Sequence, residues 1–84
     1  MGLQRQPMES KFIAIIGYVL ELEEQTLELS DRFDAFPEWD SMAQLTLMSE
    51  LKEKFAFAIE ASELRSVETL GELYRRIQAE TPKY

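Results

Sequence analysis

The stretch that decides the fold is residues 40–55, whose sequence reads DSMAQLTLMSELKEKF. Within it Leu47, Leu51 and Phe55 recur at i, i+4 and i+8, so on a helix they lie in one row along one face. Such a row is buried when the helix packs on a core. The sequence therefore predicts a helix that begins just after Asp40, runs to about Phe55 and turns this row inward.

The start of this helix carries ordinary capping signals. Pro37 precedes it, and the side chain of Asp40 or Ser41 can accept hydrogen bonds from the free N–H groups of the first turn. Ser41 and Gln44 also match the Ser-x-x-Gln capping box. On these residues alone, Ser41 is best explained as the helix cap.

Upstream, a set of apolar residues recurs close to the helical period and predicts a helix over about residues 8–24. The set is Phe12, Ile13, Ile15, Ile16, Val19, Leu20 and Leu22. Ser10 caps this helix if it starts late. Gly17 costs a helix about 1 kcal/mol relative to alanine, so we interpret it as a close contact with a neighbouring helix.

A long connection, residues 25–40, joins the two helices. Loops longer than about a dozen residues are uncommon unless they are functional or disordered. This one contains the apolar residues Leu27, Leu29, Phe33 and Phe36. We therefore expect it to pack over the core.

Downstream of the second helix, residues 56–59 read as a loop that places Phe57 or Ile59 inside, because a lone strand would have no partner. We expect residues 61–65 to form one helical turn. Apolar spacing then predicts a last helix over about residues 66–79, which Ser66 could cap.

The predicted fold class is therefore all-α, a four-helix bundle of three longer helices and one short one. The expected organisation is one domain over residues 8–79, with a flexible N-terminal segment at 1–7 and a flexible C-terminal tail at 80–84. No internal repeat divides the chain.

Residue types missing from the chain exclude several kinds of site. The 84 residues include no cysteine and no histidine. Disulfides, thiolate metal sites and every histidine-dependent triad are thus excluded. A hydrolase built on carboxylates alone needs two acids facing one cleft, and the helical spacing supplies no such pair. We expect no metal site and no catalytic residue, hence a binding, carrier or interaction domain.

The charge of the chain is strongly uneven. Residues 21–40 hold eight acidic residues and one arginine, which gives −7, and the remaining residues sum to zero. Such a segment argues against nucleic acid and anionic membranes as partners. It is either a solvated loop or a docking surface for basic partners. The start of the chain lacks the apolar core of a signal peptide, and no stretch is long enough to cross a membrane, so we expect a soluble cytoplasmic protein.

The run Asp40-Ser41-Met42, with the apolar positions that follow it, resembles the Asp-Ser-Leu motif and second helix of acyl carrier proteins. The resemblance continues downstream through Phe55-x-x-x-Ile59, the acidic turn at 60–63 and Val67-x-Thr69-Leu70-x-x-Leu73. It covers roughly residues 8–79.

Membership of that family implies a specific function. A phosphopantetheinyl transferase would move 4′-phosphopantetheine from coenzyme A onto the hydroxyl of Ser41. The thiol of this covalent cofactor would then carry acyl groups as thioesters. The chain itself would not be an enzyme: it would serve, as a monomer, separate acyl-loading and acyl-processing enzymes with basic docking surfaces.

The resemblance also implies a partner-binding surface around Ser41. Asp40, Met42 and Leu45 match positions that the family presents to the transferase and to partner enzymes. For Met42 and Leu45, burial in the core is an equally good interpretation. Glu38 and Trp39 depart from the fatty-acid type, which has Gly two residues before the Asp. They favour a carrier of a specialised pathway (polyketide, modified fatty acid or aminoacyl).

A second departure concerns charge. The family usually has an acidic second helix, whereas here its acidic and basic residues largely cancel, so docking would depend more on Asp34, Glu38 and Asp40. The alternative function is a carrier-like helical adaptor that binds a protein partner and is never modified. In that alternative Ser41 is only a cap.

Overall fold

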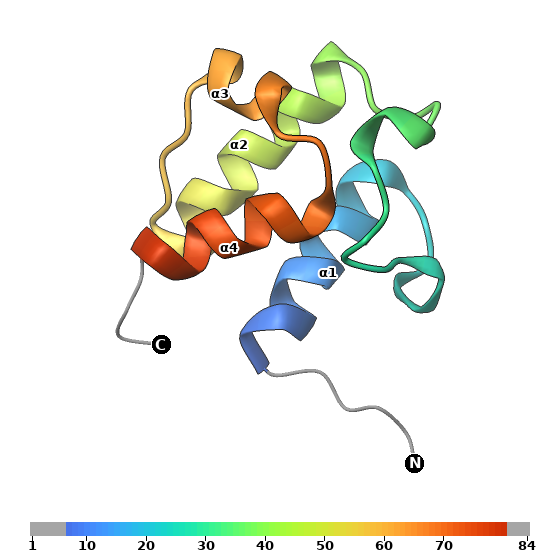
Figure 1. Ribbon diagram of the computed structural model, residues 1–84, viewed down its shortest axis with the longest axis horizontal. Helices are drawn as coiled ribbons and strands as arrows, with labels where there is room; N and C mark the ends of the chain where they lie inside the picture. Colours follow the sequence, from blue (N-terminus) through green and yellow to red (C-terminus); the bar gives the residue numbers. More distant parts are fainter. Residues whose placement is uncertain (1–6, 81–84) are drawn as a thin grey trace.

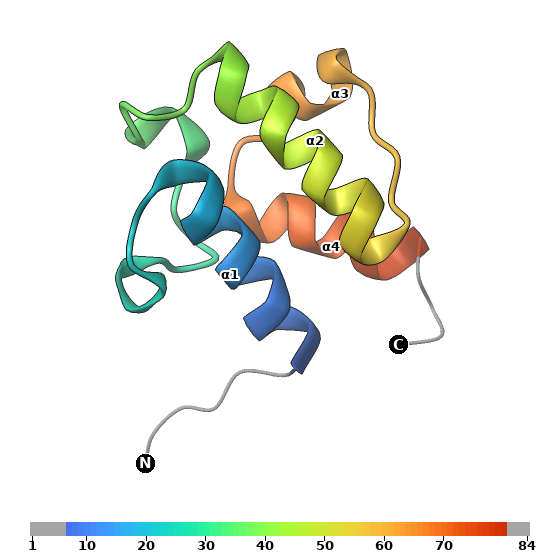
Figure 2. The same cartoon turned by 180° about the vertical axis from the view of Figure 1, so that it is seen from behind.

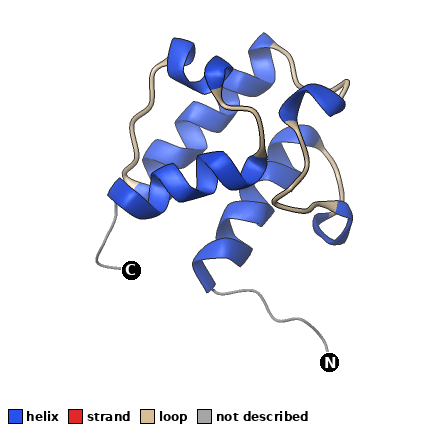
Figure 3. Cartoon of the chain, in the orientation of Figure 1, coloured by secondary structure: helices blue, strands red, loops and turns tan. Residues whose placement is uncertain are grey.

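Helices make up the regular structure of residues 7–80, the part of the chain that the computed structural model describes (Figures 1 and 3). The elements in chain order are α1 (Pro7–Leu20), the 3₁₀ turns η1 (Glu24–Thr26) and η2 (Phe33–Ala35), α2 (Ser41–Phe55), α3 (Ala61–Ser66) and α4 (Leu70–Glu80). Within residues 7–80 there is no strand, only an isolated bridge between Arg32 and Thr69. The predicted all-α bundle of three longer helices and one short one is confirmed.

The core lies where α1, α2 and α4 meet (Figures 1 and 2). The predicted row of α2 is buried, since Leu47 and Leu51 are 0% exposed and Phe55 is 2% exposed. Between α1 and α4, the rings of Phe12 and Tyr74 lie with their centroids 5.3 Å apart. Burial of the Tyr74 side chain raises the pKa of its hydroxyl above the usual value. Packing of apolar side chains from all three helices therefore holds the bundle together.

The connections between helices are packed as predicted. In the long loop Leu27 and Phe33 are buried, and Leu29 and Phe36 are partly buried against the core. α2 ends at Phe55 and is followed by Ala56, which adopts the left-handed conformation common at helix C-termini. The chain then reverses, and Phe57 and Ile59 of the 56–59 connector are both buried. These connections are therefore part of the hydrophobic core.

α1 ends at Leu20, so the prediction that it reaches Glu24 is wrong. Glu21 has a positive φ of 59°, and the N–H of Leu22 donates to the carbonyl of Gly17 at 2.9 Å. This is the hydrogen bond of a Schellman-type helix end. It turns the chain so that Leu22 packs against the core instead of continuing the helix.

The interpretation of Gly17 in α1 is also wrong. The close neighbour of Gly17 is the turn that follows its own helix and not a neighbouring helix, because a Cβ there would lie 2.9 Å from the carbonyl oxygen of Leu22. The late start that would have made Ser10 the cap does not occur, since the helix starts at Pro7 and Ser10 lies inside it. Proline is well suited to a first helical turn, where its missing N–H costs no hydrogen bond.

α4 begins at Leu70, so the prediction of a start near Ser66 is wrong. Ser66 ends α3 and donates its hydroxyl to the carbonyl of Glu63 at 2.7 Å. The residue in the capping role is Thr69, whose Oγ1 accepts from the N–H of Glu72 at 3.1 Å. The pattern Thr69-x-x-Glu72 is a capping-box signal in the sequence that places the helix start correctly.

Main-chain hydrogen bonds between the long loop and the α3–α4 linker explain why 67–69 stay extended. The N–H of Phe33 donates to the carbonyl of Glu68 at 2.9 Å, and the N–H of Leu70 donates to that of Asp31 at 3.0 Å. The N–H of Gly71 donates to the carbonyl of Leu29 at 2.7 Å. We call these three bonds the loop–linker clamp. They fasten the loop that leads to Ser41 onto the start of α4.

The expected flexible ends, 1–7 and 80–84, lie outside the described residues except for Pro7 and Glu80, which begin α1 and end α4. None of the helices in the described part is long and apolar enough to cross a membrane. Within 7–80 no group of three or more metal-ligating side chains is gathered in one place.

The Gly17→Ala substitution tests the turn after α1. Alanine is the better helix former, but its Cβ would press on the carbonyl oxygen of Leu22, a residue whose N–H is held by the hydrogen bond to the carbonyl of Gly17. We expect a loss of about 1–2 kcal/mol in the free energy of unfolding, measured by urea denaturation. Ser10→Ala, at an exposed site of the same helix, should be neutral or slightly stabilising. A Gly17→Ala protein as stable as the parent would contradict the close contact.

Candidate functional site

The first turn of α2 is organised by Asp40. Its backbone is extended, and its Oδ1 accepts a hydrogen bond from the N–H of Ala43 at 2.8 Å. The carbonyl of Asp40 accepts from the N–H of Gln44 at 2.9 Å. Asp40 is therefore the N-cap, and the predicted capping box of Ser41 and Gln44 is wrong. Aspartate in an extended conformation aims its carboxylate at the first-turn amides, and this geometry leaves Ser41 inside the helix as its first residue.

Ser41 is left exposed and without a structural task. Its hydroxyl makes no hydrogen bond to any described residue, and its side chain lies at the surface. The N–H groups of Ser41 and Met42 likewise have no acceptor within residues 7–80, as expected for the first turn of a helix. An exposed hydroxyl thus stands beside two open amides at the positive end of the helix dipole, an arrangement that suits a covalently attached phosphate.

Trp39, two residues before Ser41, is held in place by contacts with the loop. Its ring lies against that of Phe33, with centroids 4.5 Å apart and planes tilted by 34°. The main-chain N–H of Trp39 donates to the carbonyl of Phe36 at 3.0 Å. Phe33 is buried and belongs to the loop–linker clamp, so the clamp, Phe33 and Trp39 form a continuous support for the residue before Asp40.

Three large apolar side chains are exposed near this end of the bundle. Within residues 7–80 the exposed large hydrophobics are Met42 at 72%, Tyr18 at 67% and Leu45 at 61%. Burial of Met42 and Leu45 in the core was one of two interpretations, and it is wrong. The exposure of Tyr18 was not predicted, although Tyr18 lies seven residues after the charged Lys11 on the same face of α1, a spacing that the sequence shows.

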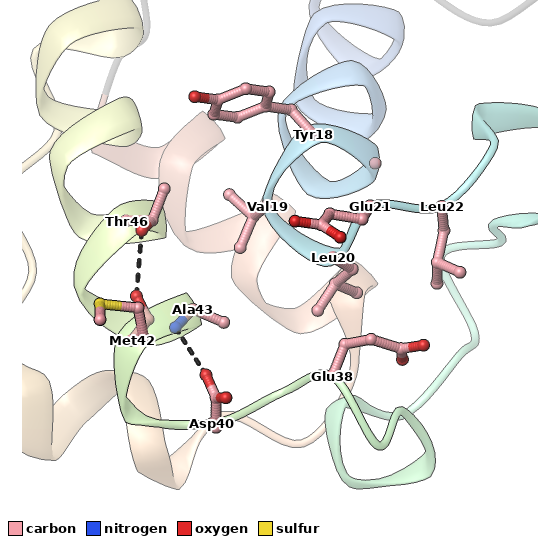
Figure 4. Close-up of a pocket in the computed structure, with 11 residues that line it drawn as sticks. Tyr18, Val19, Leu20, Glu21, Leu22, Glu38, Asp40, Met42, Ala43 and Thr46 are labelled. Carbon is pink, nitrogen blue, oxygen red and sulfur yellow. Dashed lines mark hydrogen bonds between the residues drawn. The ribbon is translucent and has the colours of Figure 1, made fainter.

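A groove of about 690 Å³ separates the last turn of α1 from the first turn of α2 (Figure 4). Side chains of α2, among them Met42 and Thr46, lie across the groove from Val19 and Leu20 of α1. Its lining includes the carboxylates of three residues and no lysine or arginine. The acidic lining residues are Glu21, Glu38 and Asp40.

The three acids expected to dock partners have different surroundings. Asp34 is paired with Arg32, whose nitrogens lie 3.1 and 3.2 Å from its carboxylate oxygens. The hydrogen bond from Arg32 holds the pKa of the Asp34 carboxyl below its usual value. Asp40 is engaged as the N-cap. Glu38, exposed and without an ion pair among the described residues, is the acid with a free charge.

Comparison with known proteins agrees with this geometry. Residues 10–77 match the family model described as a phosphopantetheine attachment site. Among solved structures, a holo acyl carrier protein from Nitrosomonas europaea is similar to the chain, with a TM-score of 0.72 and 30% sequence identity. The match covers 89% of this chain and 96% of that one. No curated protein matches the chain in sequence.

The family match spans α1 to α4, and the structural match includes an acyl carrier protein in its modified form. Domains of this kind are generally not catalytic and carry their cofactor covalently. The chain belongs to the phosphopantetheine attachment family and is a carrier protein of the acyl carrier type, with phosphopantetheine as its covalent cofactor.

Proposed function

We propose that this protein carries acyl intermediates as thioesters on a 4′-phosphopantetheine arm attached to Ser41. The observation that carries the proposal is the exposed hydroxyl of Ser41 at the first position of α2, with no hydrogen bond to any residue in 7–80. Asp40 does the capping, so modification of Ser41 removes no interaction that the fold uses. When bound, the arm supplies a thiol that forms thioesters.

The attachment needs no catalytic group from this chain. The oxygen of Ser41 forms a bond to the phosphorus of the pantetheine phosphate in coenzyme A, its proton passes to a base of the transferase, and adenosine 3′,5′-bisphosphate leaves. The product is a phosphodiester, which the open N–H groups of Ser41 and Met42 favour through hydrogen bonding and the helix dipole. The role of this protein is therefore that of a non-catalytic carrier.

Partner enzymes would dock on the surface around Ser41 that is formed by Glu38, Met42 and Leu45. Met42 and Leu45 supply exposed apolar area, and Glu38 supplies an unpaired charge. Basic partner surfaces with an apolar centre complement this pattern. Asp40 and Trp39 contribute by holding the first turn of α2 in place, since both have partners inside the protein. Asp34 contributes less charge because Arg32 pairs with it.

The pathway served is proposed to be a specialised one, in polyketide, modified fatty acid or aminoacyl synthesis. The support is the sequence Glu38-Trp39 before Asp40, where the fatty-acid type has a glycine two residues before the aspartate. Glu38 stands at that glycine position, and the Trp39 ring beside it packs on Phe33 as part of the loop.

Incubation with coenzyme A and a broad-specificity phosphopantetheinyl transferase tests the attachment site. The protein should gain the mass of one phosphopantetheinyl group, read by intact-protein mass spectrometry. Ser41→Ala should gain nothing, whereas Ser49→Ala, at an exposed serine of the same helix, should be modified like the parent. An unmodified parent would favour the adaptor alternative, and a modified Ser41→Ala would place the attachment on another residue.

Separate roles for Asp40 and Ser41 predict different stabilities. Asp40→Ala loses the hydrogen bond to the N–H of Ala43 and should lower the free energy of unfolding by about 1 kcal/mol. Ser41→Ala removes no hydrogen bond to a described residue and should change it by less than about 0.5 kcal/mol. Chemical denaturation of the unmodified proteins measures both. A larger loss for Ser41→Ala than for Asp40→Ala would return the capping role to the serine.

Charge reversal tests the docking surface. Glu38→Lys should lower the kcat/KM of the transferase for this carrier by roughly three- to tenfold at low salt, because it replaces attraction by repulsion. The effect should shrink as salt screens the charges. Glu53→Lys changes charge equally on α2 but away from the groove. If the two variants are equally impaired, net charge and not this surface governs docking.

A further inference from the structure

The groove between α1 and α2 lies next to the proposed attachment residue and has no role so far. Met42 and Ala43, which directly follow Ser41, line it from the α2 side. Its farthest lining residue on α2, Thr46, is five residues from Ser41, a helical rise of about 7.5 Å. An arm with roughly the backbone length of five extended residues spans about 16 Å. The end of the arm can therefore fold back into the groove with its cargo.

We infer that this groove holds the end of the arm together with a short acyl group that carries a protonated amine. The inference rests on the proposed function, since it needs an arm on Ser41. The volume of about 690 Å³ is in the range of small-molecule sites. Val19 and Met42 offer apolar contacts to the methyl and methylene groups of the arm.

The charges of the groove decide which cargo it suits. Its three carboxylates are hydrogen-bond acceptors only, and no lysine or arginine lines it. Neither Glu21 nor Glu38 forms an ion pair with a cation of residues 7–80. Figure 4 shows both side chains at the groove, on the side away from Thr46. An ammonium group at the end of the cargo finds free acceptors here, whereas a carboxylate meets like charge.

A second groove along the same two helices offers no free cation that could bind a carboxylate cargo. It is lined by Lys11 and Lys54 among others, but both cations are engaged. The amine of Lys54 lies 2.7 Å from the carboxylate of Glu50, and that of Lys11 lies over the ring of Phe55 at 5.3 Å. Lys54 is also 13 residues from Ser41, a rise of about 20 Å along the helix. The free charge within reach of the arm is therefore negative.

Two matched cargoes test the inference. The protein is loaded by the transferase from the coenzyme A thioesters of 3-aminopropionic acid and of butyric acid, whose acyl groups have equal numbers of heavy atoms and differ in an ammonium against a methyl. Mass spectrometry first verifies the loading of Ser41. Backbone amide chemical shifts of residues 18–22 are then compared with those of the free-thiol form. These residues of α1 are distant in sequence from the attachment point and report on occupancy of the groove.

We expect shift changes at 18–22 for the aminopropionyl form that are about two- to fivefold larger than for the butyryl form, in line with surface ion pairs. The difference should shrink at high salt and disappear in Glu21→Gln, but persist in Glu53→Gln, whose site is exposed on α2 outside the groove. Equal changes for the two cargoes overturn the amine selectivity. Changes absent from 18–22 overturn the groove as the binding place. Both results require loaded protein, so they differ from a failure of the attachment on Ser41.

Discussion

The hydrogen bond from the N–H of Ala43 to the carboxylate of Asp40 fixes where α2 begins, and the site depends on that position. With Asp40 as the cap, Ser41 becomes the first helical residue and keeps a free, exposed hydroxyl. Had the serine been the cap, its oxygen would have been engaged with a backbone donor. Asp40 thus caps the helix, and the hydroxyl of Ser41 stays available for modification beside two open amides.

That first turn is held in place by contacts far away in the sequence. The loop–linker clamp joins the long loop to the α3–α4 linker through main-chain hydrogen bonds, and Phe33, which belongs to it, is buried. Trp39 packs on Phe33, and this contact holds the backbone directly before Asp40 in place. A long loop with buried anchors and fixed backbone bonds loses little further entropy when a partner binds, which suits a loop beside a docking surface.

The surface around Ser41 combines apolar and acidic groups with little competition from nearby cations. Met42 and Leu45 remain exposed although the α2 row Leu47, Leu51 and Phe55 is buried, because they lie on a different face of the same helix. Because Asp34 is paired with Arg32, it contributes little charge to this surface, whereas Glu38 keeps its free charge. The same surface continues into the α1–α2 groove, so partner recognition and cargo binding would share one end of the bundle.

The sequence by itself determined the four-helix architecture, the buried row of α2 and the packed loop, because periodicity and apolar anchors are local patterns that report burial directly. It also singled out Ser41. The helix ends, the identity of the cap and the exposure of Met42, Leu45 and Tyr18 were decided by tertiary structure. The C-terminal end of α1 depends on a left-handed turn at Glu21. The start of α4 has a local cap at Thr69, and the hydrogen bonds that fasten it to the loop join segments 35 to 42 residues apart, such as Phe33 and Glu68. A side chain's exposure likewise depends on which neighbour covers its face, and no local pattern contains that information.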